Sequence, residues 1–520
     1  MTRNRCLIRG GLIALTSMGV FASVALADDR SECTKAAGEE AIAACSRLIS
    51  SQSQPLHTWF YNRGNAYERK GDLDAAMADF NAAIRLDVKF AAAYTTRGTT
   101  YWRQGNSEQA LADWNEAIRL APRYSVAYMN SLPFMNRGAL YYASRREYDK
   151  AIADLDQAIR LDPKNALAYS NRGWVLSQQG RYEPAMSDLD EAIRLGPTLA
   201  KAYNNRGFVL SRLGQIDRAI ADLGIAIRLD PTDPQSYSNR GAIYLEKGQL
   251  AQAIADLNEA IRLDRKKVES LVVRAFVNTE LGQIEQAIAD SNEAIRIEPK
   301  AARAYVSRGD ARLKAGLLQQ AFADFDEAIR LDPQMGLARA GRANAFLAAG
   351  QLQRAVADLD DAIRLSPRFA MAYLNRGLAF ERLGRLKEAL ADYSETIRLS
   401  PGLALAHYNS GNIHREMKQF DRAIAAYTEA IRLDPSFAQA LTDRGVIHYL
   451  LDHVDQAMAD YEASLQLRPQ DARTYFNRGS AYRKKGQIEQ AIADYRKALE
   501  LDRNLVQARA RLKELGVDEP

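Results

Sequence analysis

The dipeptide Arg-Gly recurs along most of the chain, and from Gly173 onward the glycine or its substitute returns every 34 residues. A fixed period of this length indicates one small supersecondary unit repeated many times. A single such unit cannot bury its apolar face alone, so it must stack on its neighbours. We therefore expect about thirteen stacked repeats. This array replaces the three or four globular domains that 520 residues would otherwise suggest.

Each repeat predicts two helices. In the first, an apolar residue four before the glycine and an aromatic three after it share one helical face, as with Phe60 and Tyr67. A second glycine seven residues later, such as Gly71, ends that helix. The second helix follows as Ala-Ile-Ala-Asp-Leu-x-x-Ala-Ile-Arg-Leu-Asp-Pro, seen at residues 151–163. Its alanines allow close helix packing, and the proline terminates it.

These offsets of glycine, aromatic, alanine and proline in a 34-residue unit resemble the tetratricopeptide repeat family, over residues 57–505. The resemblance implies an all-α fold, a right-handed α-solenoid superhelix of about thirteen tetratricopeptide repeats. It also implies that the first helices line a concave groove, which holds a peptide or an extended protein segment. That functional step rests on family analogy.

The array has distinct ends and one irregularity. Residues 28–56 are predicted to form a degenerate N-terminal half-repeat, and residues 506–520 a C-terminal capping helix and tail, because an open solenoid needs polar terminal units. Six extra residues enter near 125–130, with one more in the next turn. They form either a longer loop or extended first helix, or a hinge.

The N-terminus has the layout of a secretory signal peptide over residues 1–27. Arg3, Arg5 and Arg9 precede an apolar stretch that ends in Ala25-Leu26-Ala27. The alternative, a membrane anchor, needs about 20 apolar residues, and this stretch is shorter. We expect an exported protein, periplasmic or secreted, with no stable membrane insertion after cleavage.

Cys33 and Cys45 are the only cysteines after the predicted cleavage site. In an oxidising compartment they are expected to form a disulfide that closes a short loop. Two buried thiols are the alternative. A metal site is not expected, because no further ligand lies nearby in the sequence.

The charge balance argues against a nucleic-acid partner. Without the three arginines of the signal peptide, 67 basic residues face 65 acidic ones, a net charge of +2. A nucleic-acid-binding protein is expected to carry a basic patch, whereas here the two signs alternate along the chain.

The arginine before the glycine and an aspartate in the second helix occur together. The one repeat that lacks the arginine, at Ser410, also lacks the aspartate, at Ala426. We predict ion pairs between the two helices of a repeat or between neighbouring repeats. The alternative is a charged ladder that binds ligand. The predicted pairs include Arg172 with Asp188, Arg206 with Asp222, and Arg240 with Asp256.

Asparagine often stands two residues before the glycine. An amide donates and accepts at once, so a column of amides can hold a peptide main chain without reading its sequence. The column is similar to that in the repeat superhelix of the O-linked N-acetylglucosamine transferases. It is interrupted at Thr96, Val273, Ser307, Gly341 and Asp443, and the alternative is that the amides only solvate the groove or cap a helix. Its members are Asn62, Asn136, Asn171, Asn205, Asn239, Asn375, Asn409 and Asn477.

Aromatic residues follow the glycine on the same helices and could line the groove or belong to the core. They are Trp102, Tyr142, Trp174, Phe208 and Phe276. His414 and His448 occupy equivalent places in adjacent repeats, but a packed aromatic often stands there instead, so neither a metal nor a catalytic role is expected.

No catalytic or cofactor-binding motif occurs, so we predict neither an enzyme nor a cofactor. The leading hypothesis is an exported protein–protein interaction scaffold that binds an extended polypeptide in its groove. The alternative is a scaffold for synthesis or export of envelope polysaccharide, which binds glycan on the groove aromatics.

Overall fold

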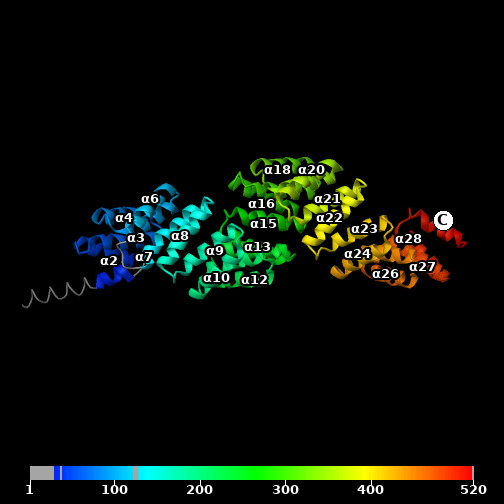
Figure 1. The fold of residues 1–520 in the computed structure, drawn as a ribbon, viewed down its shortest axis with the longest axis horizontal. Coiled ribbons are helices and arrows are strands. Elements are labelled where there is room, and N and C mark those ends of the chain that lie inside the picture. Colours follow the sequence, from blue (N-terminus) through cyan, green and yellow to red (C-terminus); the bar gives the residue numbers. More distant parts are fainter. Residues whose placement is uncertain (1–27, 36–37, 121–126, 518–520) are drawn as a thin grey trace, which may run out of the picture. The chain divides into compact units, whose positions relative to one another are not determined.

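The computed structural model describes residues 28–35, 38–120 and 127–517. Every regular element in these ranges is a helix, arranged as consecutive antiparallel pairs (Figure 1). The predicted all-α solenoid is confirmed. The signal peptide at 1–27 and the first part of the insertion near 125–130 lie outside the described residues.

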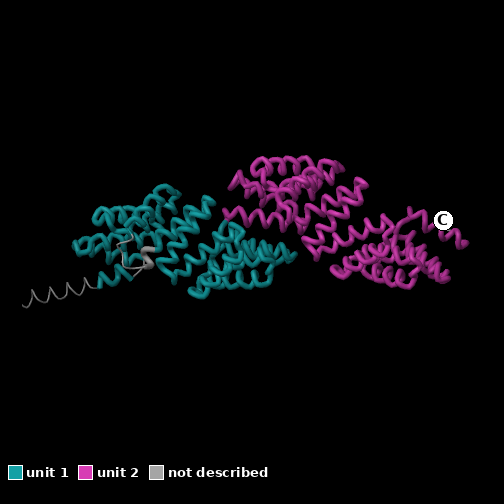
Figure 2. The backbone as a smooth tube through the Cα atoms, viewed as in Figure 1, with its two compact units in different colours: residues 1–264 teal, residues 265–520 magenta. Residues whose placement is uncertain are grey.

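Two compact units are distinguished, residues 1–264 and 265–520 (Figure 2). In unit 1 the first helices of the repeats are α3 Leu56–Lys70, α5 Ala91–Arg103, α7 Ala127–Asn136, α9 Ala166–Gln178, α11 Ala200–Arg212 and α13 Pro234–Glu246. The second helices are α4 Leu73–Leu86, α6 Ser107–Leu120, α8 Tyr148–Leu161, α10 Tyr182–Leu195, α12 Ile216–Leu229 and α14 Leu250–Leu263.

Unit 2 continues the same alternation. Its first helices are α15 Val268–Glu280, α17 Ala302–Lys314, α19 Gly336–Ala348, α21 Ala370–Arg382, α23 Ala404–Glu416, α25 Ala438–Leu450, α27 Ala472–Lys484 and the terminal α29 Val506–Glu514. The second helices are α16 Ile284–Ile297, α18 Leu318–Leu331, α20 Leu352–Leu365, α22 Leu386–Leu399, α24 Phe420–Leu433, α26 Val454–Leu467 and α28 Ile488–Leu501.

The core lies between the two helices of each repeat and continues into the next repeat. Ala219, Leu223 and Ala226 of α12 are fully buried, as are their counterparts in the other second helices. Leu223 packs against the backbone of α11, where a Cβ on Gly207 would stand 2.8 Å from its Cγ. The recurring glycine therefore lets the two helices of a repeat approach closely.

The N-terminal disulfide is confirmed. Cys33 and Cys45 are bonded, with Cα atoms 4.9 Å apart, and join the helical residues 28–35 to α2, Gly38–Ser50. Both cysteines are buried against Leu48 and Trp59. The half-repeat is thus packed on α3, the first helix of the regular array.

The irregular repeat combines a longer first helix with a local change in winding. Helix α7 begins at Ala127, contains Pro133 and leads into a π-helix, Arg137–Tyr142. The arginine and aspartate of this repeat are 17 residues apart, Arg137 and Asp154, whereas the spacing in the other pairs is 16. A π-helical turn accommodates one extra residue, so the one-residue insertion is absorbed there and the ion pair is retained.

Three repeats lack a glycine at the turn between their helices, although the backbone is still left-handed there. Arg146, Lys418 and Asp452 have φ values of 59°, 60° and 67°, close to the 72° of Gly384 in a regular repeat. A side chain disfavours this conformation by about 1–2 kcal/mol. The tight turn is therefore imposed by the packing of the helix pair.

Lys418→Gly is expected to stabilise the protein by about 0.5–1 kcal/mol, because relief of the left-handed strain outweighs the added freedom of the unfolded chain. Local amide hydrogen exchange in α23 and α24 measures the gain. Gly384→Ala at the equivalent turn should lose a similar amount. A loss of stability in Lys418→Gly would contradict this account of the turn.

Candidate functional site

Within each unit, first helices of neighbouring repeats pack side by side, and we call the surface that they present the first-helix wall. In unit 1, α11 packs against both α9 and α13. In unit 2, α17 packs against α15 and α19, and α25 packs against α27. Because the repeats are in register, side chains at one position of these helices form columns across the wall.

Two members of the asparagine column are buried in contacts between repeats. Asn205 is 4% exposed, and its Nδ2 donates to Ser170 Oγ of the preceding first helix at 3.2 Å. Asn171 is 6% exposed, and its Oδ1 accepts from Lys201 Nζ at 3.0 Å. These amides therefore join adjacent first helices, which leaves them little surface for a ligand.

Other members of the column bond across the wall in a similar way. Asn136 donates to Thr99 Oγ1 at 3.1 Å, Asn239 to Asn204 Oδ1 at 2.9 Å, and Asn375 to Asn344 Oδ1 at 2.8 Å. These three side chains are only partly buried, so part of each amide still faces outward. Five of the eight members thus link adjacent first helices, and three of these five keep some hydrogen-bonding capacity.

Three asparagines have no side-chain hydrogen bond to the described residues. Asn62 and Asn409 are partly exposed. The Nδ2 of Asn477 is buried and lacks a partner within the part of the chain that the structure describes. A buried donor without an acceptor is unfavourable, and a ligand cannot reach this atom unless the neighbouring side chains move.

The five predicted groove aromatics are all partly exposed and also touch the core. Trp102 lies against the fully buried Trp114, with ring centroids 6.3 Å apart. Trp174 and Tyr142 pack against the cluster around Leu155, Phe208 against that around Leu189, and Phe276 against that around Phe325. Each ring therefore contributes to packing and presents only part of its surface to solvent.

The arginines before the glycine form bidentate ion pairs with the aspartates of the second helices. Nearest atoms are 2.6 Å apart for Arg172 and Asp188, 2.6 Å for Arg206 and Asp222, and 2.7 Å for Arg240 and Asp256. The hydrogen bonds donated to Asp256 raise the pKa of the Arg240 guanidinium. Both partners use their charge internally, as a structural role requires.

Several of these arginines also reach the preceding repeat. Arg172 Nη1 lies 2.6 Å from Asp156 Oδ1, and Arg206 Nη1 lies 2.8 Å from Asp190 Oδ1. One guanidinium thus joins the two helices of its own repeat to the second helix before it. The two alternatives weighed for these pairs, within a repeat and between repeats, occur together.

Asp443 replaces the asparagine of the column in α25 and is the most enclosed charge of the wall, with 1% of its surface exposed. Tyr408 Oη donates to its Oδ2 at 2.8 Å, and Arg415 Nη1 lies 2.9 Å from its Oδ1. Arg473 also pairs with Oδ1. Two cations meet one carboxylate, so the cluster has a local excess of positive charge.

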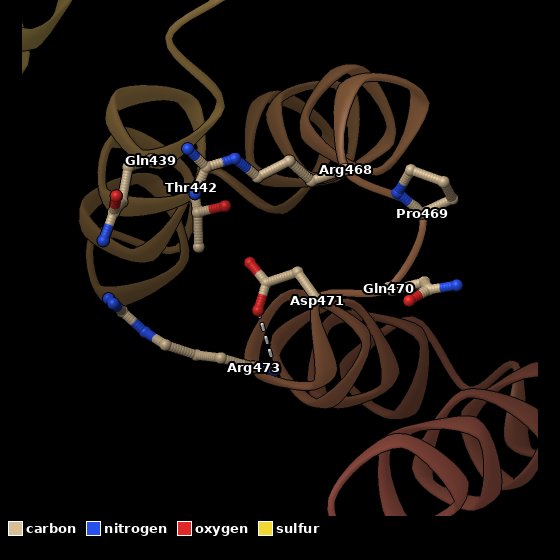
Figure 3. Close-up of a pocket in the computed structure, with 7 residues that line it drawn as sticks. All are labelled: Gln439, Thr442, Arg468, Pro469, Gln470, Asp471 and Arg473. Atoms are coloured by element: carbon tan, nitrogen blue, oxygen red, sulfur yellow. Dashed lines mark hydrogen bonds between the residues drawn. The ribbon is translucent and has the colours of Figure 1, made fainter. Parts of the chain in front are cut away.

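A pocket of about 570 Å³ lies beside this cluster, between α25, the end of α26 and the start of α27. Figure 3 shows Arg468 entering it from one side and Arg473 extending toward Gln439 on the other, with Asp471 between them. Asp471 caps α27, because its carboxylate accepts from Arg473 N at 3.1 Å and from Thr474 Oγ1 at 2.6 Å. Arg468 is exposed and forms no ion pair with any described residue.

Asp310 is a carboxyl group on the wall at the position that Trp174 and Phe208 occupy in their repeats. It is mostly buried and has no hydrogen-bond partner among the described residues. Burial raises the pKa of Asp310 to about 7, and the Glu280 carboxylate adds to the rise. Asp310 is therefore a charge that the fold tolerates poorly above neutral pH.

Asp310→Asn is expected to stabilise unit 2 by about 2 kcal/mol at pH 8, with little effect near pH 4. The folded protein binds the Asp310 proton more tightly than the unfolded chain, so the wild-type loses stability as the pH rises from about 4 to about 7. Hydrogen exchange of α17 across this range measures the effect. An unchanged pH dependence in the variant would contradict it.

Two histidines lie close together at the turn between α25 and α26. His448 and His453 have ring centroids 5.9 Å apart, and His448 Nε2 lies 3.9 Å from Asp460 Oδ2. Burial lowers the pKa of His448, which favours its neutral form. Among the described residues, no group of three side chains is arranged to hold a metal ion. No described helix is long and apolar enough to cross a bilayer.

The sequence interpretation missed one column, formed by the second residue of each first helix. In unit 2 its members from α17 to α27 are all exposed. The signal was available, because these residues recur with the same period as the asparagines. They are Arg303, Leu337, Met371, Leu405, Gln439 and Arg473.

Family models match most of the chain. Those described as tetratricopeptide repeat match residues 91–124, 234–267, 280–335, 341–404, 404–437, 438–471 and 472–505. A model described as TPR repeat matches 64–105, 139–180, 173–214 and 212–248. The chain belongs to the tetratricopeptide repeat family. Proteins of this family serve in general as non-catalytic scaffolds for protein–protein interaction.

One of the solved structures compared shares the fold of this chain at low sequence identity. The crystal structure of the APC/C hetero-tetramer Cut9-Hcn1 has a TM-score of 0.52 at 18% identity and covers 91% of this chain and 92% of that chain. A tetratricopeptide repeat protein from Parabacteroides merdae has a TM-score of 0.41 at 19% identity, with 48% and 98% covered. No curated protein matches the sequence.

Proposed function

We propose that this tetratricopeptide repeat protein is an exported interaction scaffold that binds an extended polypeptide on its first-helix wall. One observation carries the proposal: exposed side chains of the first helices recur in register, as in the column from Arg303 to Arg473. A ligand that contacts successive members of such a column must itself be elongated. A polypeptide main chain meets this requirement and can use the outward part of the column amides.

The second helices are less suited to this task. The aspartate that recurs in the second helices forms an internal ion pair with the arginine of the first helix, as in Arg376 and Asp392, whose nearest atoms are 2.7 Å apart. Their exposed surface is dominated by local pairs one turn apart, such as Arg398 with Glu395. Each of these local pairs satisfies both of its charges on the helix surface and leaves neither free for a ligand.

Export is part of the proposal. The disulfide between Cys33 and Cys45 is compatible with an oxidising compartment, where such bonds persist. The proposed location is therefore the periplasm or the cell exterior.

The test is selection of binding peptides from a random library against the purified full chain. Selected peptides are resynthesised with a photoreactive group, and the crosslinked residues are identified by mass spectrometry. We expect crosslinks to residues of the first helices, such as Met371 and Gln439, with few to exposed residues of the second helices. Failure to select any peptide, or crosslinks confined to the second helices, would reject the proposal.

A further inference from the structure

Three consecutive repeats of unit 2 expose a large apolar side chain at the same position of the wall. Leu337 is 37% exposed, Met371 45% and Leu405 42%. They are the second residues of α19, α21 and α23, and we call them the apolar stripe. Contiguous exposed apolar surface marks binding sites in soluble proteins, and these three side chains recur at one position of consecutive repeats.

The apolar stripe runs beside the asparagine column. Two hydrogen-bonded contacts establish the neighbourhood: Lys201 bonds Asn171, and Arg473 bonds Asp443, each a second residue that meets the column residue of the preceding repeat. By the same register, Leu405 neighbours Asn375 and Met371 neighbours Gly341. A chain that lies on the stripe would therefore run within reach of the column amides.

The spacing expected between neighbouring packed helices favours one conformation of the guest. Helices that pack side by side have axes about 8–10 Å apart. The polyproline II conformation has three residues per turn and rises about 3.1 Å per residue, so every third side chain points the same way at intervals of about 9 Å. In a β-strand, residues on one face are only about 7 Å apart, which matches less well.

The column is polar and charged at its C-terminal end, beyond the apolar stripe. After Leu405 the next members are Gln439 and Arg473, which line the pocket shown in Figure 3. Among the described residues that line this pocket or pair with Asp443, the arginines are Arg415, Arg468 and Arg473, and the carboxylates are Asp443 and Asp471. A guest that continues beyond the apolar stripe thus meets a site with one positive charge in excess.

We propose that the preferred guest is a polypeptide segment in the polyproline II conformation, with an apolar residue at every third position and an acidic group beyond the last of them. Its apolar side chains lie on Leu337, Met371 and Leu405, and its acidic group enters the pocket at Arg468 and Arg473. The main chain, which has no internal hydrogen bonds in this conformation, is open to Asn375 and Asn409. The inference rests on the proposed function and specifies the chemistry of its partner.

Synthetic peptides and the full-length protein test this preference. The probe peptide has three leucines, one at every third residue. It is made in two versions, one with a run of glutamates after the last leucine and one with the run before the first leucine. Control peptides place the leucines at every second residue or replace glutamate by glutamine. We expect one orientation of the probe to bind at least tenfold more tightly than either control, measured by fluorescence anisotropy. Equal binding of probe and controls would overturn the proposal.

Matched protein variants locate the site. The triple variant Leu337→Ser, Met371→Ser, Leu405→Ser should weaken probe binding at least tenfold. The control variant Leu317→Ser, Leu467→Ser, Ile488→Ser alters side chains that are 42%, 44% and 40% exposed, but lie at the ends of second helices, and should change binding less than twofold. Equal losses in both variants would contradict the assigned site.

The acidic group is tested separately with Arg468→Gln, which leaves the Asp443 cluster intact. This variant should bind the glutamate probe at least fivefold more weakly and leave the glutamine peptide unaffected. Equal effects on both peptides would contradict the assigned pocket. If library-selected peptides crosslink to first helices but the probe binds no better than its controls, this inference is wrong and the proposed function stands. If no library peptide crosslinks to first helices, the proposed function itself is wrong.

Discussion

Arg240→Ser is expected to destabilise the helix pair α13 and α14 by about 3 kcal/mol, because it leaves the Asp256 carboxylate buried without its cation. The Asp256 side chain is 9% exposed, and Arg240 supplies both of its ionic hydrogen bonds. This pair is the cleanest in the chain for the test. In the repeat before it, Asp190 forms a second ion pair with Arg206. The position equivalent to Asp190 for Arg240 is Gly224, which has no side chain to form such a pair.

The double variant Arg240→Ser, Asp256→Ala should be more stable than Arg240→Ser alone, by about 1–2 kcal/mol, since no buried charge is left unpaired. Its design copies the repeat that has Ser410 and Ala426 and still forms α23 and α24 as a regular pair. Amide exchange of α13 and α14 gives the free energies of the double-mutant cycle. Strictly additive losses would show that the ion pair contributes no coupling.

Gly411→Ala is expected to cost about 2–3 kcal/mol through overpacking. An added Cβ would stand 2.6 Å from Tyr427 Cε1 and 2.7 Å from Cδ1. Tyr427 cannot yield easily, because it is fully buried and its hydroxyl donates to Asn412 Oδ1 at 2.8 Å. The two helices of the repeat must therefore separate or the ring must leave its position.

Gly224→Ala supplies a contrast of opposite sign. Gly224 lies within α12, and an added Cβ would meet only the ends of Arg228 and Arg240 at 3.7 Å. Alanine is favoured over glycine in a helix interior by about 0.5–1 kcal/mol, so this variant should gain stability. Thermal unfolding of both variants, followed by circular dichroism, compares them. Similar changes in the two would contradict the view that close packing selects the repeat glycine.

The fold could be predicted from the sequence because each repeat carries the same local signals. The period, the turn glycines and the alanine-rich second helices specify helix pairs, and stacking follows from their apolar faces. The disulfide was expected from the predicted signal peptide and from the number of cysteines after it. The one-residue insertion was visible, but its absorption as a π-helix at Arg137–Tyr142 depends on keeping Arg137 on Asp154, a tertiary constraint.

The candidate site was less accessible, because the same pattern serves packing and binding. The sequence locates Asn171 and Asn205 on one helical face, but their burial depends on the approach of Ser170 and Lys201 from neighbouring helices. Asp443 was noted only as a break in the column. Its partners Tyr408, Arg415 and Arg473 come from two other repeats, so the cluster emerges only when the helices are stacked.

A crystal structure of the protein with a library-selected peptide would test the central claim most directly, that the first-helix wall holds an extended polypeptide. We expect continuous density for an extended chain across successive first helices, in contact with Met371 and the amide of Asn409. A peptide bound along the second helices, or one folded compactly at a single repeat, would contradict the claim.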